Sequence, residues 1–177
     1  MSSGTTTTEL ILERQTGFRF SAAHFTSHTG ERERLHGHNY SVSLRINGTL
    51  KSADADNDGI MIDFGELKKA VRSICEDLHE RFLCATLSTT TRCTINHEKE
   101  QIELQCLCDG ASFSFPLGDC VLLPLKNSTV EELSAYVAQR IVKIVGARLL
   151  ECGVHSLTCG VAELDGQEAR STLRLTT

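Results

Sequence analysis

Apolar and polar residues alternate with a period of two early in the chain, which is the pattern of half-buried β-strands. One face of residues 8–24 carries Phe18, Phe20, Ala22 and His24. From residue 36 onward, a second such face carries His36, His38, Tyr40, Val42, Leu44 and Ile46. The pattern predicts one long strand or a bent pair over residues 8–24, and another strand that starts at residue 36. Both place histidines on an apolar face.

Two later segments have apolar residues three and four positions apart, which is typical of amphipathic helices. The first follows an expected N-cap at Asp63 with Glu66 three residues later, and its stripe is Phe64, Leu67, Val71, Ile74 and Leu78. The second follows Thr129 and Glu132, which have capping-box spacing, and its stripe is Leu133, Val137, Ile141 and Ile144. We therefore expect two helices, the first of about 15 residues.

The remaining segments return to alternation. Short runs between residues 93 and 124, with a turn at 108–110, predict an extra hairpin that continues into 121–123. The last stretch has Leu157, Cys159, Val161 and Glu163 in phase, then a turn and a final strand with Leu173 and Leu175. The resulting order, β-β-α-(hairpin)-α-β-β, predicts a single α+β domain over residues 1–177. Within it we expect a hairpin insertion at 90–124 and disorder at 1–7.

Composition narrows the function classes. The 177 residues, 40% of them hydrophobic and 23% charged, suit one folded domain and contain no apolar run long enough for a membrane span. Acidic residues exceed basic ones by 23 − 18 = 5, and the basic residues are scattered, so neither nucleic acid nor a membrane is an expected partner. The start of the chain lacks the features of an export signal, so we expect a soluble, cytoplasmic protein.

The eight cysteines include no Cys-x-x-Cys pair, and we expect reduced thiols without a metal or catalytic role. Cys106 and Cys108 are in phase with Ile102 and Leu104, as small hydrophobic residues on a buried strand face would be.

The histidines carry the strongest chemical signal. If the two strands pair, His24, His36 and His38 can converge. Three neutral imidazoles without a fourth protein ligand suit a catalytic Zn²⁺ ion, which keeps an open position for water or substrate. The alternative for each histidine alone is a core residue that hydrogen-bonds to the backbone. Three together at the ends of apolar stripes favour the metal site.

Two acidic features leave alternatives open. Glu163 ends an apolar stripe, so its carboxylate either anchors a ligand with paired N–H donors or turns to solvent at the strand end. The segment Asp54-Ala-Asp-Asn-Asp-Gly59 matches the first half of a calcium loop. Its twelfth position is Gly65 instead of glutamate, which favours a polar turn between a strand and a helix.

Three motifs together resemble the 6-pyruvoyl-tetrahydropterin synthase family, which includes the queuosine-pathway carboxy-tetrahydropterin synthases. They are Phe18-Arg-Phe-Ser-Ala-Ala-His24, Leu35-His-Gly-His-Asn-Tyr40 and Ile62-Asp-Phe-Gly-Glu-Leu67. The resemblance implies a tunnelling fold, in which an antiparallel β-β-α-α-β-β sheet carries two helices on one face. It also implies a homohexamer of two stacked trimers with active sites between subunits, and zinc bound by His24, His36 and His38.

The same resemblance extends to the expected substrate site. Thr129-Val-Glu131 resembles the family's Thr-x-Glu, and Glu163 is similar to the glutamate that anchors the pterin. Helix capping alone also explains Thr129.

One departure concerns the catalytic base. The better-known members carry a cysteine four or six residues before His-Gly-His, where this chain has Arg32 and Gly30. Glu33 instead resembles the Glu-x-x-His-Gly-His pattern of a third class, which is linked to folate synthesis and cleaves the substrate side chain. A carboxylate near Zn²⁺ can accept protons if its environment tunes its pKa. The alternative is a solvated loop charge.

A second departure lies at Leu78-His-Glu-Arg-Phe-Leu83, where the family often reads Leu-Asp-His. His79 takes the aspartate position and Glu80 the histidine position. Either Glu80 is the base with His79 supporting it, or Asp77 and His79 rebuild the pair after a local shift. The remaining alternative is an ordinary helix end.

The resemblance implies a zinc-dependent lyase acting on 7,8-dihydroneopterin triphosphate. Glu33 favours retro-aldol cleavage to 6-hydroxymethyl-7,8-dihydropterin, for folate synthesis, over triphosphate elimination to 6-pyruvoyl-tetrahydropterin, for tetrahydrobiopterin synthesis. A rival from another class is a non-catalytic oligomer that binds a pterin or purine.

Overall fold

The computed structural model describes residues 6–13, 15–50 and 59–176. The calcium-loop motif lies outside the described residues, apart from Gly59. Of the segment expected to be disordered, Thr7 begins the first strand and residues 1–5 lie outside the described residues.

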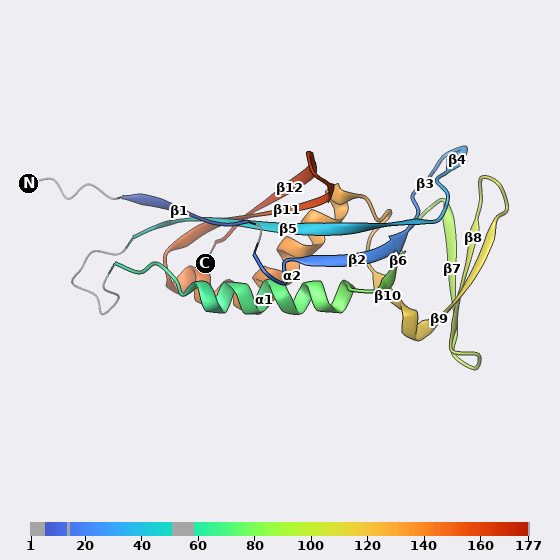
Figure 1. The fold of residues 1–177 in the computed structure, drawn as a ribbon, viewed down its shortest axis with the longest axis horizontal. Coiled ribbons are helices and arrows are strands. Elements are labelled where there is room, and N and C mark those ends of the chain that lie inside the picture. The colour runs from blue at the N-terminus through green and yellow to red at the C-terminus, as the bar shows by residue number, and fades with distance from the viewer. Residues whose placement is uncertain (1–5, 14, 51–58, 177) are drawn as a thin grey trace, which may run out of the picture.

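A seven-stranded sheet forms the body of the molecule (Figure 1). Its order is β10-β6-β2-β5-β11-β12, and β1 also pairs with β5. The bounds are β1 (Thr7–Leu12), β2 (Arg19–His24), β5 (His36–Thr49), β6 (Arg81–Ala85), β10 (Cys120–Leu123), β11 (Val154–Leu164) and β12 (Gln167–Arg174). β1 and β2 are the bent pair that the sequence allowed, because both run antiparallel to β5 and occupy successive stretches of it.

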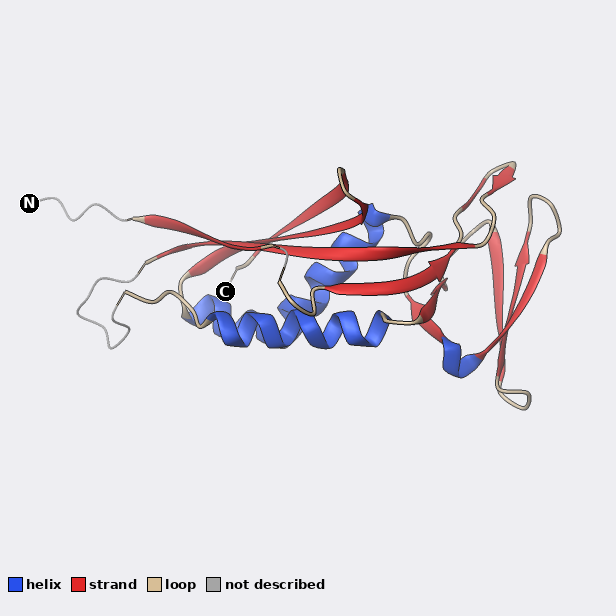
Figure 2. Ribbon diagram, viewed as in Figure 1, coloured by secondary structure: helices blue, strands red, loops and turns tan. Residues whose placement is uncertain are grey.

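Two helices, α1 (Phe64–Leu78) and α2 (Val130–Glu151), cover one face of this sheet (Figure 2). Both begin where the sequence predicts, because Asp63 accepts a hydrogen bond from the Gly65 N–H and Thr129 accepts one from the Glu132 N–H. The second hydrogen bond of a capping box, from the Thr129 N–H to the Glu132 carboxylate, is replaced. The Glu132 carboxylate accepts from the Lys126 N–H instead. The α+β fold with two helices on one face is confirmed.

Two residues of the predicted helix stripes are not in the core. Phe64 at the start of α1 and Ile144 in α2 are 43% and 50% exposed, whereas the other stripe residues are buried.

The sheet differs from an all-antiparallel one at a single edge. β6 runs parallel to β2, with Ala22 opposite Arg81, and β10 runs parallel to β6. Helix α1 carries the chain back along the sheet, so that β6 enters in the direction of β2.

The insertion forms a separate sheet of three strands, where the sequence predicts a hairpin. They are β7 (Thr91–Asn96), β8 (Gln101–Cys106) and β9 (Ser112–Pro116), and a short 3-10 turn, η1 (Leu117–Asp119), leads to β10. A second apolar cluster packs this sheet against the main one, and it consists of Ile102, Leu104 and Cys106 of β8 with Phe82 and Cys84 of β6 and Phe25 after β2. Beside it lies a small hairpin of β3 (Ser27–His28) and β4 (Glu31–Arg32) (Figure 1).

All eight cysteines are free thiols. Cys106 is fully buried on the strand face where it is expected, whereas Cys108 lies in the turn after β8 and is partly exposed. Among the helices that the structure describes, none is long and apolar enough to cross a membrane.

Candidate functional site

The three histidines of the apolar stripes converge at one end of the central sheet. Antiparallel pairing of β2 and β5 sets His24 opposite His36, and His38 follows two residues later on the same face. The ring centroids lie 4.6 Å apart for His24 and His36, 5.2 Å for His24 and His38, and 4.8 Å for His36 and His38. One ligand atom from each ring lies within 4.8 Å of the others, so the group can hold a metal ion.

Backbone carbonyls fix the tautomers of two of these rings. His24 Nδ1 lies 3.1 Å from the Ser128 carbonyl oxygen, and His36 Nδ1 lies 2.7 Å from the Arg34 carbonyl oxygen. A carbonyl oxygen only accepts hydrogen bonds, so each Nδ1 carries the proton and each Nε2 keeps a free lone pair. Metal-binding histidines are oriented in the same way.

His24 shows most clearly that the group fits a metal. It is 1% exposed, and its buried Nε2 has no hydrogen-bond partner among the described residues. Burial, together with the neighbouring His36 and His38, lowers the pKa of His24 to about 4. His24 is therefore neutral at physiological pH, as a metal ligand must be. A set of three imidazoles suits Zn²⁺ among the common divalent ions.

Glu33 lies directly after the β3–β4 hairpin, close to this group. Its carboxylate accepts a hydrogen bond from the Thr26 N–H at 3.1 Å, and its own N–H donates to the Thr26 carbonyl at 3.0 Å. Partial burial raises the pKa of Glu33, but the Thr26 hydrogen bonds, together with smaller electrostatic effects of the His36 and His24 rings in their protonated forms, bring it below its ordinary value. This direction is opposite to the upward tuning that suits a base at neutral pH.

The backbone of a single residue of β2, Ser21, holds the end of helix α1 through two hydrogen bonds. The Ser21 N–H donates to His79 Nδ1 at 3.0 Å, so the proton of that ring is on Nε2. The Ser21 carbonyl accepts from the Glu80 N–H at 2.7 Å. Glu80 has a φ of 54°, in the left-handed region that costs a non-glycine residue of order 1 kcal/mol or more.

Asp77 is not brought to His79. Its carboxylate accepts a hydrogen bond from Arg140 on α2 at 2.7 Å. The geometry thus favours His79 with Glu80 over the pair of Asp77 and His79.

Two cavities meet at His38. One, of about 520 Å³, is lined by Glu80 and Phe115 among others, and the second, of about 660 Å³, is lined by Arg19 and Glu163 among others. Both also contain Gly37, His38 and Asn39. Glu163 Oε2 lies 4.0 Å from His38 Nε2. Glu163 therefore faces the site instead of the solvent beyond a strand end.

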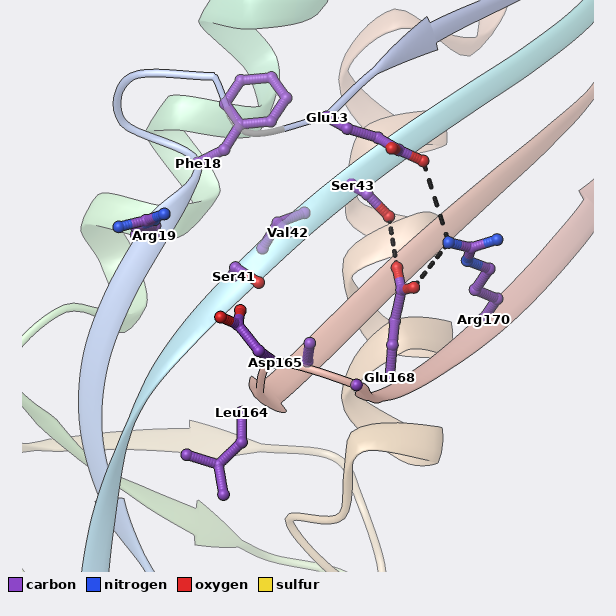
Figure 3. A pocket seen from close by; sticks show the side chains of 12 residues that line it. Glu13, Phe18, Arg19, Ser41, Val42, Ser43, Leu164, Asp165, Glu168 and Arg170 are labelled. Atoms are coloured by element: carbon purple, nitrogen blue, oxygen red, sulfur yellow. Dashed lines mark hydrogen bonds and ion pairs between the residues drawn. The ribbon is translucent and has the colours of Figure 1, made fainter.

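A third hollow, of about 650 Å³, shares Arg19, Ser41 and Leu164 with the Glu163 cavity. Three of its charged side chains, Glu13, Glu168 and Arg170, interact with one another, whereas no dashed line reaches Arg19 or Asp165 in Figure 3. Glu168 accepts hydrogen bonds from Ser43 at 2.7 Å and from Arg170 at 2.6 Å. These contacts leave the hollow less suited to a charged ligand than the cavities around His38.

The start of helix α2 lies next to the histidines because Ser128 contacts His24. Thr129 caps the helix, with its hydroxyl accepting from the Glu132 N–H at 3.4 Å. Glu131 is exposed, and its carbonyl accepts from the Ser134 hydroxyl. The structure therefore brings the backbone at Thr129 near the site, while the side chain of Thr129 serves the helix.

The sequence does not predict the groups that orient the site. These groups are Ser128, the Arg34 carbonyl, the Thr26 backbone and the Ser21 N–H. Most act through main-chain atoms, which leave no residue pattern. The only sequence signal at Ser128 is its position directly before the N-cap Thr129.

Comparisons with known proteins agree with this geometry. The sequence profile of the 6-pyruvoyl tetrahydropterin synthase family matches residues 13–167. A protein of Methanocaldococcus jannaschii is 29% identical over 130 residues, covering 71% of this chain and 72% of its own. A 6-carboxy-5,6,7,8-tetrahydropterin synthase of Haemophilus influenzae is 36% identical over 61 residues, 34% of this chain and 43% of its own.

Solved structures are similar over nearly the whole chain. A Plasmodium vivax 6-pyruvoyltetrahydropterin synthase, in which a catalytic glutamate is replaced by alanine, has a TM-score of 0.87 and 32% identity, covering 96% of this chain and 99% of its own. The Plasmodium falciparum 6-pyruvoyl tetrahydropterin synthase has a TM-score of 0.86 and 32% identity, covering 95% and 98%. The match over residues 13–167, the fold and the three histidines lead to one conclusion: the chain belongs to the 6-pyruvoyl tetrahydropterin synthase family.

Proposed function

We propose that this chain is a zinc-dependent lyase that acts on 7,8-dihydroneopterin triphosphate and releases 6-hydroxymethyl-7,8-dihydropterin. The observation that carries the proposal is the carboxylate of Glu33 beside three convergent histidines. The Plasmodium vivax protein, whose catalytic residue is a glutamate, supports a carboxylate in this role. The name of that protein also favours the second candidate, triphosphate elimination to 6-pyruvoyl-tetrahydropterin.

His24, His36 and His38 would hold the metal ion. When bound, Zn²⁺ acts as a Lewis acid that makes the side-chain hydroxyls of the substrate more acidic. A weak base then suffices, which is compatible with the lowered pKa of Glu33. In a retro-aldol step Glu33 would accept the proton of the C2′ hydroxyl, and the C2′–O bond would become a carbonyl as the C1′–C2′ bond breaks. C2′ and C3′ would leave as an aldehyde that carries the triphosphate, and the electron pair of the broken bond would pass to C1′ and the pterin ring.

His79 and Glu80 would return a proton to C1′. The Ser21 N–H holds His79 Nδ1 as an acceptor, so the Nε2–H of that ring is available as a donor. Glu80 lines the same cavity as His38, which gives it access to a substrate bound there.

Glu163 would bind the amino-pyrimidine edge of the pterin with paired hydrogen bonds, a contact that Thr129 and Glu131 would border. We expect Glu163→Gln to raise KM by about 10-fold to 100-fold and to change kcat far less, because hydrogen bonds to a charged group contribute about 1.5–3 kcal/mol. Steady-state kinetics measures both constants. Glu98→Gln, in the exposed turn after β7, is the matched control and should leave KM unchanged. An unchanged KM in Glu163→Gln would remove this residue from the pterin site.

The reaction itself is tested by product analysis. Zinc-loaded protein is incubated with 7,8-dihydroneopterin triphosphate, and the products are identified by mass spectrometry. We expect 6-hydroxymethyl-7,8-dihydropterin, whereas 6-pyruvoyl-tetrahydropterin would establish elimination instead. Tight pterin binding without turnover would contradict a lyase and leave a binding oligomer.

We propose that the working form is a cytoplasmic homohexamer of two stacked trimers. β10 and β12 are the two edges of the sheet order, and open edges favour pairing with further strands. Light scattering on the assayed sample gives the mass of this assembly.

A further inference from the structure

Arg32 in β4 connects the inserted three-stranded sheet to Glu33. Its Nε and one terminal nitrogen lie 3.0 Å and 2.9 Å from Asp109 Oδ2, in the turn between β8 and β9. Its other terminal nitrogen donates to the Glu33 carbonyl oxygen at 2.9 Å. The guanidinium group also lies 5.3 Å from the centre of the Phe113 ring. The Arg32 side chain thus links β4 to the β8–β9 turn, 77 residues further along the chain.

The Asp109 end of this connection is well anchored. Asp109 Oδ1 accepts a hydrogen bond from the Ala111 N–H, which fixes the turn, and Phe113 stacks on Phe25 with ring centroids 5.1 Å apart. The Arg32 side chain is only 17% exposed. Its partner Asp109 is 43% exposed, so the support from this ion pair comes from its geometry, with two nitrogens on one oxygen.

The Glu33 end of this connection is a main-chain contact. Glu33 is tied to Thr26 by its own N–H and by its carboxylate, and the only link from the Arg32 side chain to this residue is the Glu33 carbonyl. A second contact from the insertion, from the Thr90 hydroxyl to the Ser27 carbonyl at 2.8 Å, holds the opposite strand of the hairpin. The inserted sheet therefore contacts both strands of the hairpin that ends at Glu33.

We propose that Arg32 is a positioning residue, which uses the inserted sheet as a rigid support to hold the Glu33 carboxylate toward the three histidines. This inference rests on the proposed function, in which Glu33 accepts the substrate proton. Displacement of a reacting group by about 1 Å can lower a rate by about a hundredfold, so a distant support can govern turnover without touching the substrate.

The kinetic test is a double-mutant cycle. We expect Arg32→Ala to lower kcat by about 10-fold to 100-fold and to leave KM within about twofold. In a Glu33→Gln background the same change should cause no further loss, because Arg32 acts through Glu33. Arg32→Lys keeps the positive charge but lacks the planar guanidinium group that donates to two acceptors. Its kcat should therefore lie between those of Arg32→Ala and the wild-type protein. Arg92→Ala, on the exposed side of the same inserted sheet, is the control and should keep the full kcat.

A second readout does not need turnover. Hydrogen exchange at the Thr26 and Glu33 amides should become faster in Arg32→Ala, with no change in the amides of β5 and β11. Asp109→Asn should have the same effect, since it removes the charge yet keeps an acceptor for the Ala111 N–H. Unchanged exchange at both amides would overturn the proposal, as would equal loss of kcat with and without the Glu33 carboxylate. If the wild-type protein forms no product, the proposed function fails, and the exchange measurement still decides the role of Arg32.

Discussion

Replacing His36 with alanine is expected to release the metal ion and to lower kcat by about a thousandfold or more. A bound metal supplies several kcal/mol of transition-state stabilisation, and each 1.36 kcal/mol is a factor of about ten in rate. His36 suits this test better than His24, because His36 is exposed while His24 is buried against Ser128. Zinc per chain is measured by mass spectrometry of the dissolved metal, alongside kcat.

The matched control is His97→Ala, an exposed histidine outside the site, which should keep both zinc and turnover. Thermal unfolding of the two apo proteins should give similar midpoints, because neither side chain is in the core. One zinc ion per chain in His36→Ala, with wild-type kcat, would refute the ligand assignment.

Replacing Glu33 with glutamine is expected to lower kcat by about 10²-fold to 10⁴-fold, which is the usual contribution of a general base. The amide oxygen of glutamine can still accept the Thr26 hydrogen bond, so the loop should keep its conformation. Zinc content and pterin affinity should therefore remain near wild-type values. Rapid-quench measurement of a single turnover isolates the chemical step.

Glu31→Gln, an exposed carboxylate two residues earlier in β4, tests whether loop charge alone matters and should leave kcat unchanged. Equal rates for wild-type protein and Glu33→Gln would make Glu33 a loop charge and assign proton abstraction to another group.

The main elements of the fold could be predicted because their apolar residues follow one period. β5 alternates without interruption from Tyr40 to Ile46, and α1 begins at an N-cap that its sequence shows. β6 gave no such signal, since Phe82, Leu83 and Cys84 are buried in succession between two parallel neighbours. β7 was missed because most of its residues are polar or partly exposed, and its pairing depends on β8.

The three-histidine group could be predicted from the sequence for a related reason. His24, His36 and His38 occupy apolar positions of two strands, so strand pairing alone brings them together. Arg32 and Asp109 illustrate the opposite case, because an ion pair across 77 positions of chain follows from the tertiary fold and not from any local pattern. The direction of the pKa shift at Glu33 likewise depends on a Thr26 contact that no motif encodes.

The clamp at the end of α1 has a consequence for how this protein can vary. Ser21 holds His79 and Glu80 with its amide and carbonyl groups, while its hydroxyl is bonded separately to Asn39. Every amino acid except proline supplies the same two main-chain groups. The positions of His79 and Glu80, to which we assign the proposed proton transfer, thus depend on the backbone of residue 21. A substitution of Ser21 by any residue other than proline is expected to keep both main-chain contacts.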